Sequence, residues 1–229
     1  MTAPTASPLS RNIEIDPAHA ALLFIDVQNY TSGPDGGEYA HLDPAAREER
    51  YGWFFRVMRE TAIPNMQRLQ AACRRGGIEV LYTTIESLTR DGRDRGLDYK
   101  ISGFNVPRGS WDGRVIDAIA PGEDEIVLPK TSSSVFISTN IDYLLRNLGV
   151  RSLVIAGVLT DQCIDSAVRD ACDLGYLVTT VTDACATLNQ DRHDWSLRNN
   201  GGYCRQCTTA ELVAEIERLI PIQRHPLAG

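Results

Sequence analysis

The sequence predicts a three-layer, doubly wound (Rossmann-like) α/β fold, with a mainly parallel sheet of five to six strands and helices on both faces. Five short apolar runs recur along the chain, and helix-like stretches separate them. The runs lack polar alternation, which is typical of parallel strands buried on both faces. They cover residues 20–25, 78–83, 125–128, 152–156 and 176–181.

The stretches between these runs carry helix signals. Residues 45–75 have apolar side chains at helical spacing, a proline (Pro64) suited to a first turn, and a Gly76-Gly77 stop. Further helices are expected from Thr139 to Gly149, from Cys163 to Gly175 and over residues 209–219. Strand and helix therefore alternate along most of the chain.

Two segments do not fit this alternation. Residues 30–43 are rich in Gly and Asp and contain Pro34, residues 86–114 are rich in Arg, Asp and Gly, and the two segments follow the first two predicted strands. Long loops at the carboxyl ends of strands commonly shape a substrate site.

Length and composition predict one domain over residues 1–229, with 43% hydrophobic content and a net charge of −7. The first 16 residues are rich in Pro, Ser and Thr, and we expect a flexible or loosely attached tail there. The negative charge offers no basic field for nucleic acid or an anionic membrane. Without an apolar leader or a long apolar run, the chain is expected to be a cytoplasmic protein with a small-molecule substrate.

The cysteines suit a reducing compartment better than a disulfide framework. Cys73, Cys172 and Cys185 fall in helix or strand-end patterns and are interpreted as small buried hydrophobes. Cys204 and Cys207 form a lone CxxC pair without a second pair, so zinc and redox interpretations are disfavoured and their role stays open.

Three apolar runs lead to three different reactive side chains. Asp26 follows the first run, Lys130 the third and Cys163 the fourth. Because the carboxyl ends of parallel strands line one crevice, the acid, the amine and the thiol are expected to converge. Cys163 would attack, Asp26 would take its proton, and Lys130 would hold positive charge beside both.

The position of Cys163 favours this chemistry. With Thr160 as an N-cap, the thiol would lie in the first helical turn, where the helix dipole and Lys130 would lower its pKa. Its own N–H would also point toward a tetrahedral intermediate. Taken alone, Cys163 is equally compatible with a helix-start packing residue, and Asp26 with a helix cap or a metal ligand.

Four sequence blocks resemble the isochorismatase-like cysteine hydrolases, a family that includes N-carbamoylsarcosine amidase, ureidoacrylate amidohydrolase, biuret and triuret hydrolases, nicotinamidase and isochorismatase. The blocks occur in the family order and are FIDVQN (24–29), LPK with SVF (128–136), AGVLTDQC (156–163) and VTDACA (181–186).

This resemblance implies a catalytic triad of Asp26, Lys130 and Cys163, with a cis peptide between Val158 and Leu159. The backbone N–H groups of Leu159 and Cys163 would then form an oxyanion hole. The implied reaction is acyl transfer through a Cys163 thioester, with release of ammonia or an amine. The family commonly forms dimers or tetramers, so a homo-oligomer is expected. The aromatic residues Tyr51, Trp53, Phe54 and Phe55 are assigned to core packing in preference to an interface.

The sequence lacks the histidines that would bind a metal ion, so we expect the protein to use no metal and no other cofactor. Nicotinamidases carry an Asp-x-His pair and a further His after the second strand, where this chain has IESLTR (85–90) and no histidine between residues 51 and 190. The four histidines are scattered: His19, His41, His193 and His225. Vinyl-ether hydrolysis, the isochorismatase reaction, would leave Cys163 without a task.

We therefore expect a cysteine amidohydrolase that cleaves a small linear carbamoyl compound, similar to biuret, triuret, ureidoacrylate or an N-carbamoyl amino acid. The alternatives are a hydrolase of a cyclic substrate, of the isochorismatase or nicotinamidase type, and a non-catalytic or redox-thiol relative. Polar side chains of the loops and of the segment after the fifth strand are the candidate substrate contacts: Asn29, Tyr30, Glu86, Arg90, Lys100, Asn200, Tyr203 and Arg205.

Overall fold

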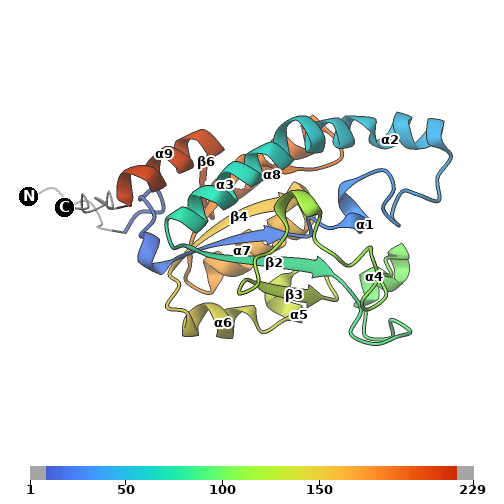
Figure 1. Cartoon of the computed structure of the whole chain (residues 1–229), viewed down its shortest axis with the longest axis horizontal. Coiled ribbons are helices and arrows are strands. Elements are labelled where there is room, and N and C mark those ends of the chain that lie inside the picture. Colours follow the sequence, from blue (N-terminus) through green and yellow to red (C-terminus); the bar gives the residue numbers. More distant parts are fainter. Residues whose placement is uncertain (1–8, 221–229) are drawn as a thin grey trace, which may run out of the picture.

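The computed structural model describes residues 9–220, in which one six-stranded sheet has helices on both faces (Figure 1). The strand order is β3-β2-β1-β4-β5-β6, and every adjacent pair is parallel. The predicted fold class is confirmed. The strands are β1 (Ala20–Ile25), β2 (Glu79–Ile85), β3 (Ile126–Lys130), β4 (Ser152–Val158), β5 (Leu177–Ala186) and β6 (Arg205–Cys207).

The helices follow the predicted alternation, with differences in their bounds. The predicted helix 45–75 consists of α2 (Pro44–Val57), a π-helical segment η2 (Met58–Ala62) and α3 (Ile63–Arg75), which has Pro64 in its first turn. The others are η1 (Pro17–His19), α1 (Asn29–Ser32), α4 (Leu97–Ser102), η3 (Asp117–Ile119), α5 (Val135–Ser138), α6 (Ile141–Asn147), η4 (Thr160–Ile164), α7 (Asp165–Asp173), α8 (Gln190–Asn200) and α9 (Thr209–Leu219). None of the helices described has the length and apolar character needed to cross a membrane.

The two faces of the sheet bury alternate residues of the same strands. In β1, Leu22 and Phe24 pack with residues of α2, α3 and α9, whereas Leu23 and Ile25 pack with residues of α5, α6 and α7. Figure 1 shows α3 and α9 on one side of the sheet and α5 and α6 on the other. Because both faces are covered, the central strands are apolar throughout, which explains the absence of polar alternation.

The aromatic residues of α2 pack in the core. The ring centroid of Tyr39, which is fully buried, lies 4.8 Å from that of Tyr51 and 5.0 Å from that of Phe55. Phe54 is also fully buried, and Trp53 packs partly against the same core. These rings therefore fix the chain between α1 and α2 to the body of the molecule.

The N-terminal segment differs from the expected loose tail. Residues 1–8 lie outside the described residues, but residues 13–16 are attached to the body of the protein. The N–H of Ile15 donates to Glu215 at 2.9 Å, the carbonyl of Ile13 accepts from Arg205 at 3.0 Å, and Glu14 pairs with Arg218. The side chain of Ile15 is buried in the core, and this burial holds the segment in place.

The two remaining cysteines of interest also pack in the interior. Cys207 ends β6 and Cys204 precedes it, and both are buried free thiols. Thr180 donates to the sulfur of Cys204 at 3.4 Å, and this sulfur lies 3.3 Å from the carbonyl oxygen of Asn200. They contribute to the packing of the β6 edge.

Gly157 lets β4 approach β1 closely at their carboxyl ends. It stands opposite Ile25 in the register, has φ +129°, and an added Cβ would lie 2.2 Å from the carbonyl oxygen of Ile25. The pairing of β4 with β5 is also irregular between Ile155 and Gly157. The close approach sets the distance between the segments that follow the two strands.

We expect Gly157→Ala to lower the free energy of unfolding by about 3 kcal/mol or more, because the new methyl group would meet backbone atoms that cannot rotate away. Urea denaturation measures this loss. Gly201→Ala is the control, since Gly201 has an ordinary φ of −57° and its Cβ would meet nothing closer than 3.5 Å, so its effect should stay within about 1 kcal/mol. Equal stability of the two variants would contradict the close approach.

Candidate active site

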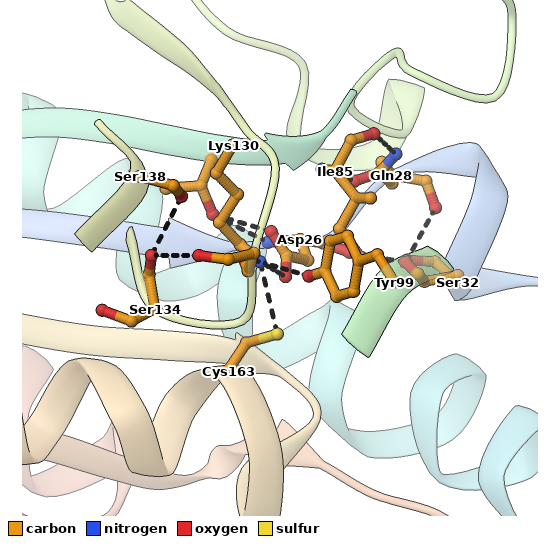
Figure 2. A network of polar contacts seen from close by, with 12 residues as sticks. Asp26, Gln28, Ser32, Ile85, Tyr99, Lys130, Ser134, Ser138 and Cys163 are labelled. Atoms are coloured by element: carbon orange, nitrogen blue, oxygen red, sulfur yellow. Dashed lines mark hydrogen bonds and ion pairs between the residues drawn. The ribbon is translucent and has the colours of Figure 1, made fainter. Parts of the chain in front are cut away.

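The three reactive residues expected at strand ends lie in contact with one another (Figure 2). Asp26 follows β1, Lys130 ends β3, and Cys163 lies in η4 after β4. The Nζ atom of Lys130 is 2.8 Å from Oδ2 of Asp26 and 3.3 Å from Sγ of Cys163. All three side chains are buried, so the group is shielded from bulk water.

The backbone turns sharply at Asp26 and orients its carboxylate. Asp26 has φ 55°, in the left-handed region that aspartate tolerates better than most residues. The hydroxyl of Thr83 donates to Oδ1 of Asp26 at 2.8 Å, and the hydroxyl of Thr31 donates to its carbonyl oxygen at 2.5 Å. One carboxylate oxygen thus faces Thr83 while the other faces Lys130.

The ammonium group of Lys130 is surrounded by acceptors. Besides Asp26 and Cys163, it donates to the carbonyl of Ser132 at 2.8 Å and to the hydroxyl of Tyr99 at 3.0 Å. Burial alone would lower the pKa of Lys130, but Asp26, Cys163 and Tyr99 outweigh it and raise this pKa above its ordinary value. Lys130 therefore remains charged.

The pKa of the Cys163 thiol is raised, whereas the sequence predicted that it would be lowered. Burial raises the pKa of Cys163 to about 12, and the charge of Lys130 offsets only part of this effect. Cys163 lies within the π-helical segment η4, whose N-cap is Leu159 rather than Thr160, and the Thr160 hydroxyl instead contacts His193 at 2.9 Å. The thiol is therefore harder to ionise than an ordinary cysteine thiol.

A cavity of about 330 Å³ opens onto the thiol, at the lower end of the size range of small-molecule sites. The peptide bond between Val158 and Leu159 is cis, at the position that the family resemblance implies, and both residues line the cavity with Cys163. The other lining residues are Asp26, Thr31, Glu38, Ile85, Asp98, Tyr99, Ser102, Phe104, Ser133, Asp161, Gln162, Asp165 and Ser166.

None of the eight substrate contacts proposed from the sequence lines this cavity. In the loops, Asn29 donates to the carbonyl of Trp111 at 2.9 Å and Glu86 accepts from the N–H of Gly109 at 2.7 Å. Tyr30 is buried against Phe104, behind the cavity wall. Arg90 and Lys100 are exposed. The loops do shape the site, but through other residues.

The three candidate contacts after the fifth strand lie toward the amino edge of the sheet, whereas the cavity lies at its carboxyl edge. In β6, Arg205 pairs with Thr179, which is close to the amino end of β5, and its guanidinium binds Glu215. Because β6 is parallel to β5, the segment that leads into it approaches the amino edge. Asn200 is buried in that segment, and Tyr203 lies under the guanidinium of Arg169, with its ring centroid 4.6 Å away.

Sequence reasoning missed several residues that do line the cavity. Tyr99, which contacts Lys130, is the neighbour of the proposed Lys100 in the short helix α4, where Tyr99 is buried and Lys100 is exposed. Glu38 and Asp98 belong to the two long loops, and Asp161 lies within the AGVLTDQC block. The two long loops were the only sign in the sequence that such residues line the cavity. The sequence does not reveal which of the loop side chains turn inward.

The titratable side chains are not arranged as a metal site. Within residues 9–220, no group of three or more His, Cys, Asp or Glu could hold a metal ion. Of the histidines, His19 pairs with Asp16 and His193 contacts Thr160, while His225 lies outside the described residues.

A family model, a curated protein and solved structures that are similar to this chain are all hydrolases or contain the isochorismatase domain. The isochorismatase domain model matches residues 20–211. The ureidoacrylate amidohydrolase RutB of Rhizobium rhizogenes is 28% identical over 197 residues, 78% of this chain and 75% of the relative. A cysteine hydrolase of Pseudomonas syringae pv. phaseolicola superposes with a TM-score of 0.77 and 24% identity, over 94% of this chain and 100% of that chain. The N-carbamoylsarcosine amidase of Thermoplasma acidophilum superposes with a TM-score of 0.61 and 24% identity. This match covers 83% of this chain and 96% of that chain.

We expect Asp26→Asn to lower the free energy of unfolding by about 3–5 kcal/mol, because it leaves the buried ammonium of Lys130 without a countercharge. Thermal or urea denaturation measures the loss. The control is Glu217→Gln, which breaks the exposed pair with Arg75 at 3.1 Å and should cost no more than about 1 kcal/mol. Equal losses in the two variants would mean that the buried pair is not needed for stability.

The raised pKa of Cys163 predicts slow alkylation at neutral pH. Only the thiolate reacts with iodoacetamide, so the rate constant should rise about tenfold per pH unit and show no plateau up to pH ~9. Peptide mass spectrometry separates Cys163 from the other cysteines, and glutathione serves as an ordinary thiol for reference. A plateau below pH ~8 would show that the thiol ionises easily, as the sequence alone suggested.

Proposed function

The chain belongs to the isochorismatase family, and from this premise we propose that it is a cysteine amidohydrolase that cleaves the amide or ureido C–N bond of a small linear carbamoyl compound. The observation that carries the proposal is the contact of Lys130 with both Asp26 and Cys163, beside a cavity of substrate size. This arrangement holds a nucleophile, a proton acceptor and a fixed positive charge together.

In the acylation step, the sulfur of Cys163 attacks the substrate carbonyl carbon while the thiol proton passes to Asp26. The C=O π pair moves to the oxygen, and the resulting oxyanion accepts hydrogen bonds from the N–H groups of Leu159 and Cys163. Reformation of the carbonyl breaks the C–N bond, and Asp26 returns the proton to the leaving nitrogen. Ammonia or an amine departs, and a thioester remains on Cys163.

In the hydrolysis step, Asp26 takes a proton from water as the water oxygen attacks the thioester carbon. The C–S bond then breaks, the proton returns to the sulfur, and a carboxylic or carbamic acid leaves. Throughout, Lys130 compensates negative charge on Asp26 and on the sulfur. A neutral resting thiol fits this scheme, because the same carboxylate that accepts its proton lies beside it.

The substrate class rests on two further observations. The relative at 28% identity is a ureidoacrylate amidohydrolase, which supports a linear ureide over a cyclic substrate. The cavity volume of about 330 Å³ suits a small molecule. The complete set of Asp26, Lys130 and Cys163 favours hydrolysis over a non-catalytic or redox role.

We also propose how the enzyme works in the cell, namely its need for metal or cofactor, its location and its assembly. The chain lacks the histidines of metal-dependent relatives after β2, so the reaction is metal-independent and uses no other cofactor. The enzyme acts in the cytoplasm as a homo-oligomer of two or four chains, has no nucleic-acid or membrane partner, and forms one domain over residues 1–229, as family resemblance, composition and charge suggest.

The test compares the turnover of linear ureides (biuret, triuret, ureidoacrylate and N-carbamoyl amino acids) with that of nicotinamide and isochorismate, with a chelator present. We expect a linear ureide to be the best substrate and Cys163→Ala to lower turnover at least about a thousand-fold, since it removes the nucleophile. Mass spectrometry of the quenched reaction should show an acyl adduct on Cys163.

The matched control is Cys172→Ala, which removes another free thiol from α7 without touching the cavity and should turn over normally. Preferred hydrolysis of isochorismate, or activity that survives Cys163→Ala, would contradict the proposal. Loss of activity with the chelator would contradict metal independence.

A further inference from the structure

The charged side chains that line the cavity beside Cys163 are all of one sign. They are carboxylates, and within residues 9–220 no Lys, Arg or His lines the cavity. The chain as a whole carries 23 Lys and Arg against 30 Asp and Glu, so an acidic composition alone does not account for this selection. The five carboxylates are Asp26, Glu38, Asp98, Asp161 and Asp165.

Three of these carboxylates are neutralised by cations that stand outside the cavity. Asp26 pairs with Lys130 at 2.8 Å. Asp161 pairs with Arg192 at 2.5 Å, and Asp165 pairs with Arg169 at 3.1 Å. Their charges are therefore largely balanced before any substrate enters.

Glu38 and Asp98 are different, because neither forms an ion pair with any of the described residues. Asp98 is exposed in the first turn of α4. Glu38 is partly buried, and burial raises its pKa to about 7. The Glu38 side chain interacts with the hydroxyl of Tyr39 but lacks full hydration and a protein countercharge, which makes it the stronger site for a ligand cation.

The position of Glu38 is fixed by its neighbours. The N–H of Gly37 donates to Oδ1 of Asp112 at 3.0 Å, and Tyr39 on the other side is fully buried among aromatic rings. The N–H of Glu38 itself donates to the carbonyl of Tyr30 at 3.4 Å. These contacts fix the backbone of Glu38 beside the cavity, so little backbone ordering remains to be paid for when a ligand binds.

We infer that the substrate carries a positively charged group, an ammonium or a guanidinium, which binds Glu38 while the scissile carbonyl lies against Cys163. The inference rests on the proposed function and narrows its substrate class. Among linear ureides, those with a free carboxylate, such as ureidoacrylate and the N-carbamoyl amino acids, are therefore disfavoured, because they would bring a negative charge toward Glu38 and Asp98. Asp98 at the rim adds to the attraction for a cation.

The test uses monosubstituted ureas of equal chain length that end in an ammonium, a methyl or a carboxylate group. For the wild-type enzyme, kcat/KM should be about 10- to 100-fold higher for the ammonium compound than for the methyl compound, and lowest for the carboxylate. Glu38→Gln keeps the size of the side chain and removes its charge, so the ammonium-to-methyl ratio should fall about tenfold or more. A purely structural role of Glu38 would lower all three values together.

Glu49→Gln is the matched control, because it removes one negative charge from the exposed face of α2, away from the cavity, and should leave the ratio unchanged. Calorimetric binding of the three ureas to Cys163→Ala, with and without Glu38→Gln, measures the same selectivity without turnover.

The binding and turnover measurements separate the two claims. Selective binding of the ammonium compound that depends on Glu38, but without any cleavage by the wild-type enzyme, would support the inference and contradict the proposed function. Cleavage that depends on Cys163 but shows no preference for the cation, or a preference that survives Glu38→Gln, would overturn the inference alone. Preference for the carboxylate compound would also overturn it.

Discussion

The ion pair between Asp26 and Lys130 is the interaction on which the site depends. Two charges with almost no exposed surface must compensate each other, because water contributes little to their stabilisation. Their strands are not neighbours: β2 separates β1 from β3, and Lys130 stands opposite Ile85 at the end of β2. The pair therefore requires the order and register of three strands to be correct at once, and it links the stability of the sheet to the geometry of the site.

The same pair lies beside the thiol of Cys163 but does not control its ionisation. Its sulfur lies 3.3 Å from a charged ammonium, yet burial dominates and raises the pKa of the thiol to about 12. A buried thiol of this kind is protected from random alkylation and oxidation, since only the thiolate reacts readily. In the proposed mechanism, the thiol becomes nucleophilic when a substrate carbonyl arrives and its proton moves to Asp26. That mechanism links reactivity to substrate binding.

The strands and the loops have separate tasks in this arrangement. Strand ends supply Asp26, Lys130 and, through η4, Cys163, whereas the two long loops supply Glu38, Asp98 and Tyr99. A rigid sheet holds these three residues, and loops fixed to it by contacts such as Gly37 with Asp112 define the shape and charge of the cavity. Relatives with the same fold can thus keep the chemistry and differ in what they accept.

The sequence by itself determined the parallel sheet, most strand positions and the three residues at the strand ends, because an unbroken apolar run marks both a buried strand and the place where it stops. It did not determine the cavity lining. Tyr99 rather than Lys100 turns inward, and Arg205 lies toward the amino edge because β6 pairs it with Thr179. The ionisation of Cys163 was likewise decided by the tertiary structure, since desolvation depends on how completely distant segments enclose a group, and local sequence does not record that enclosure.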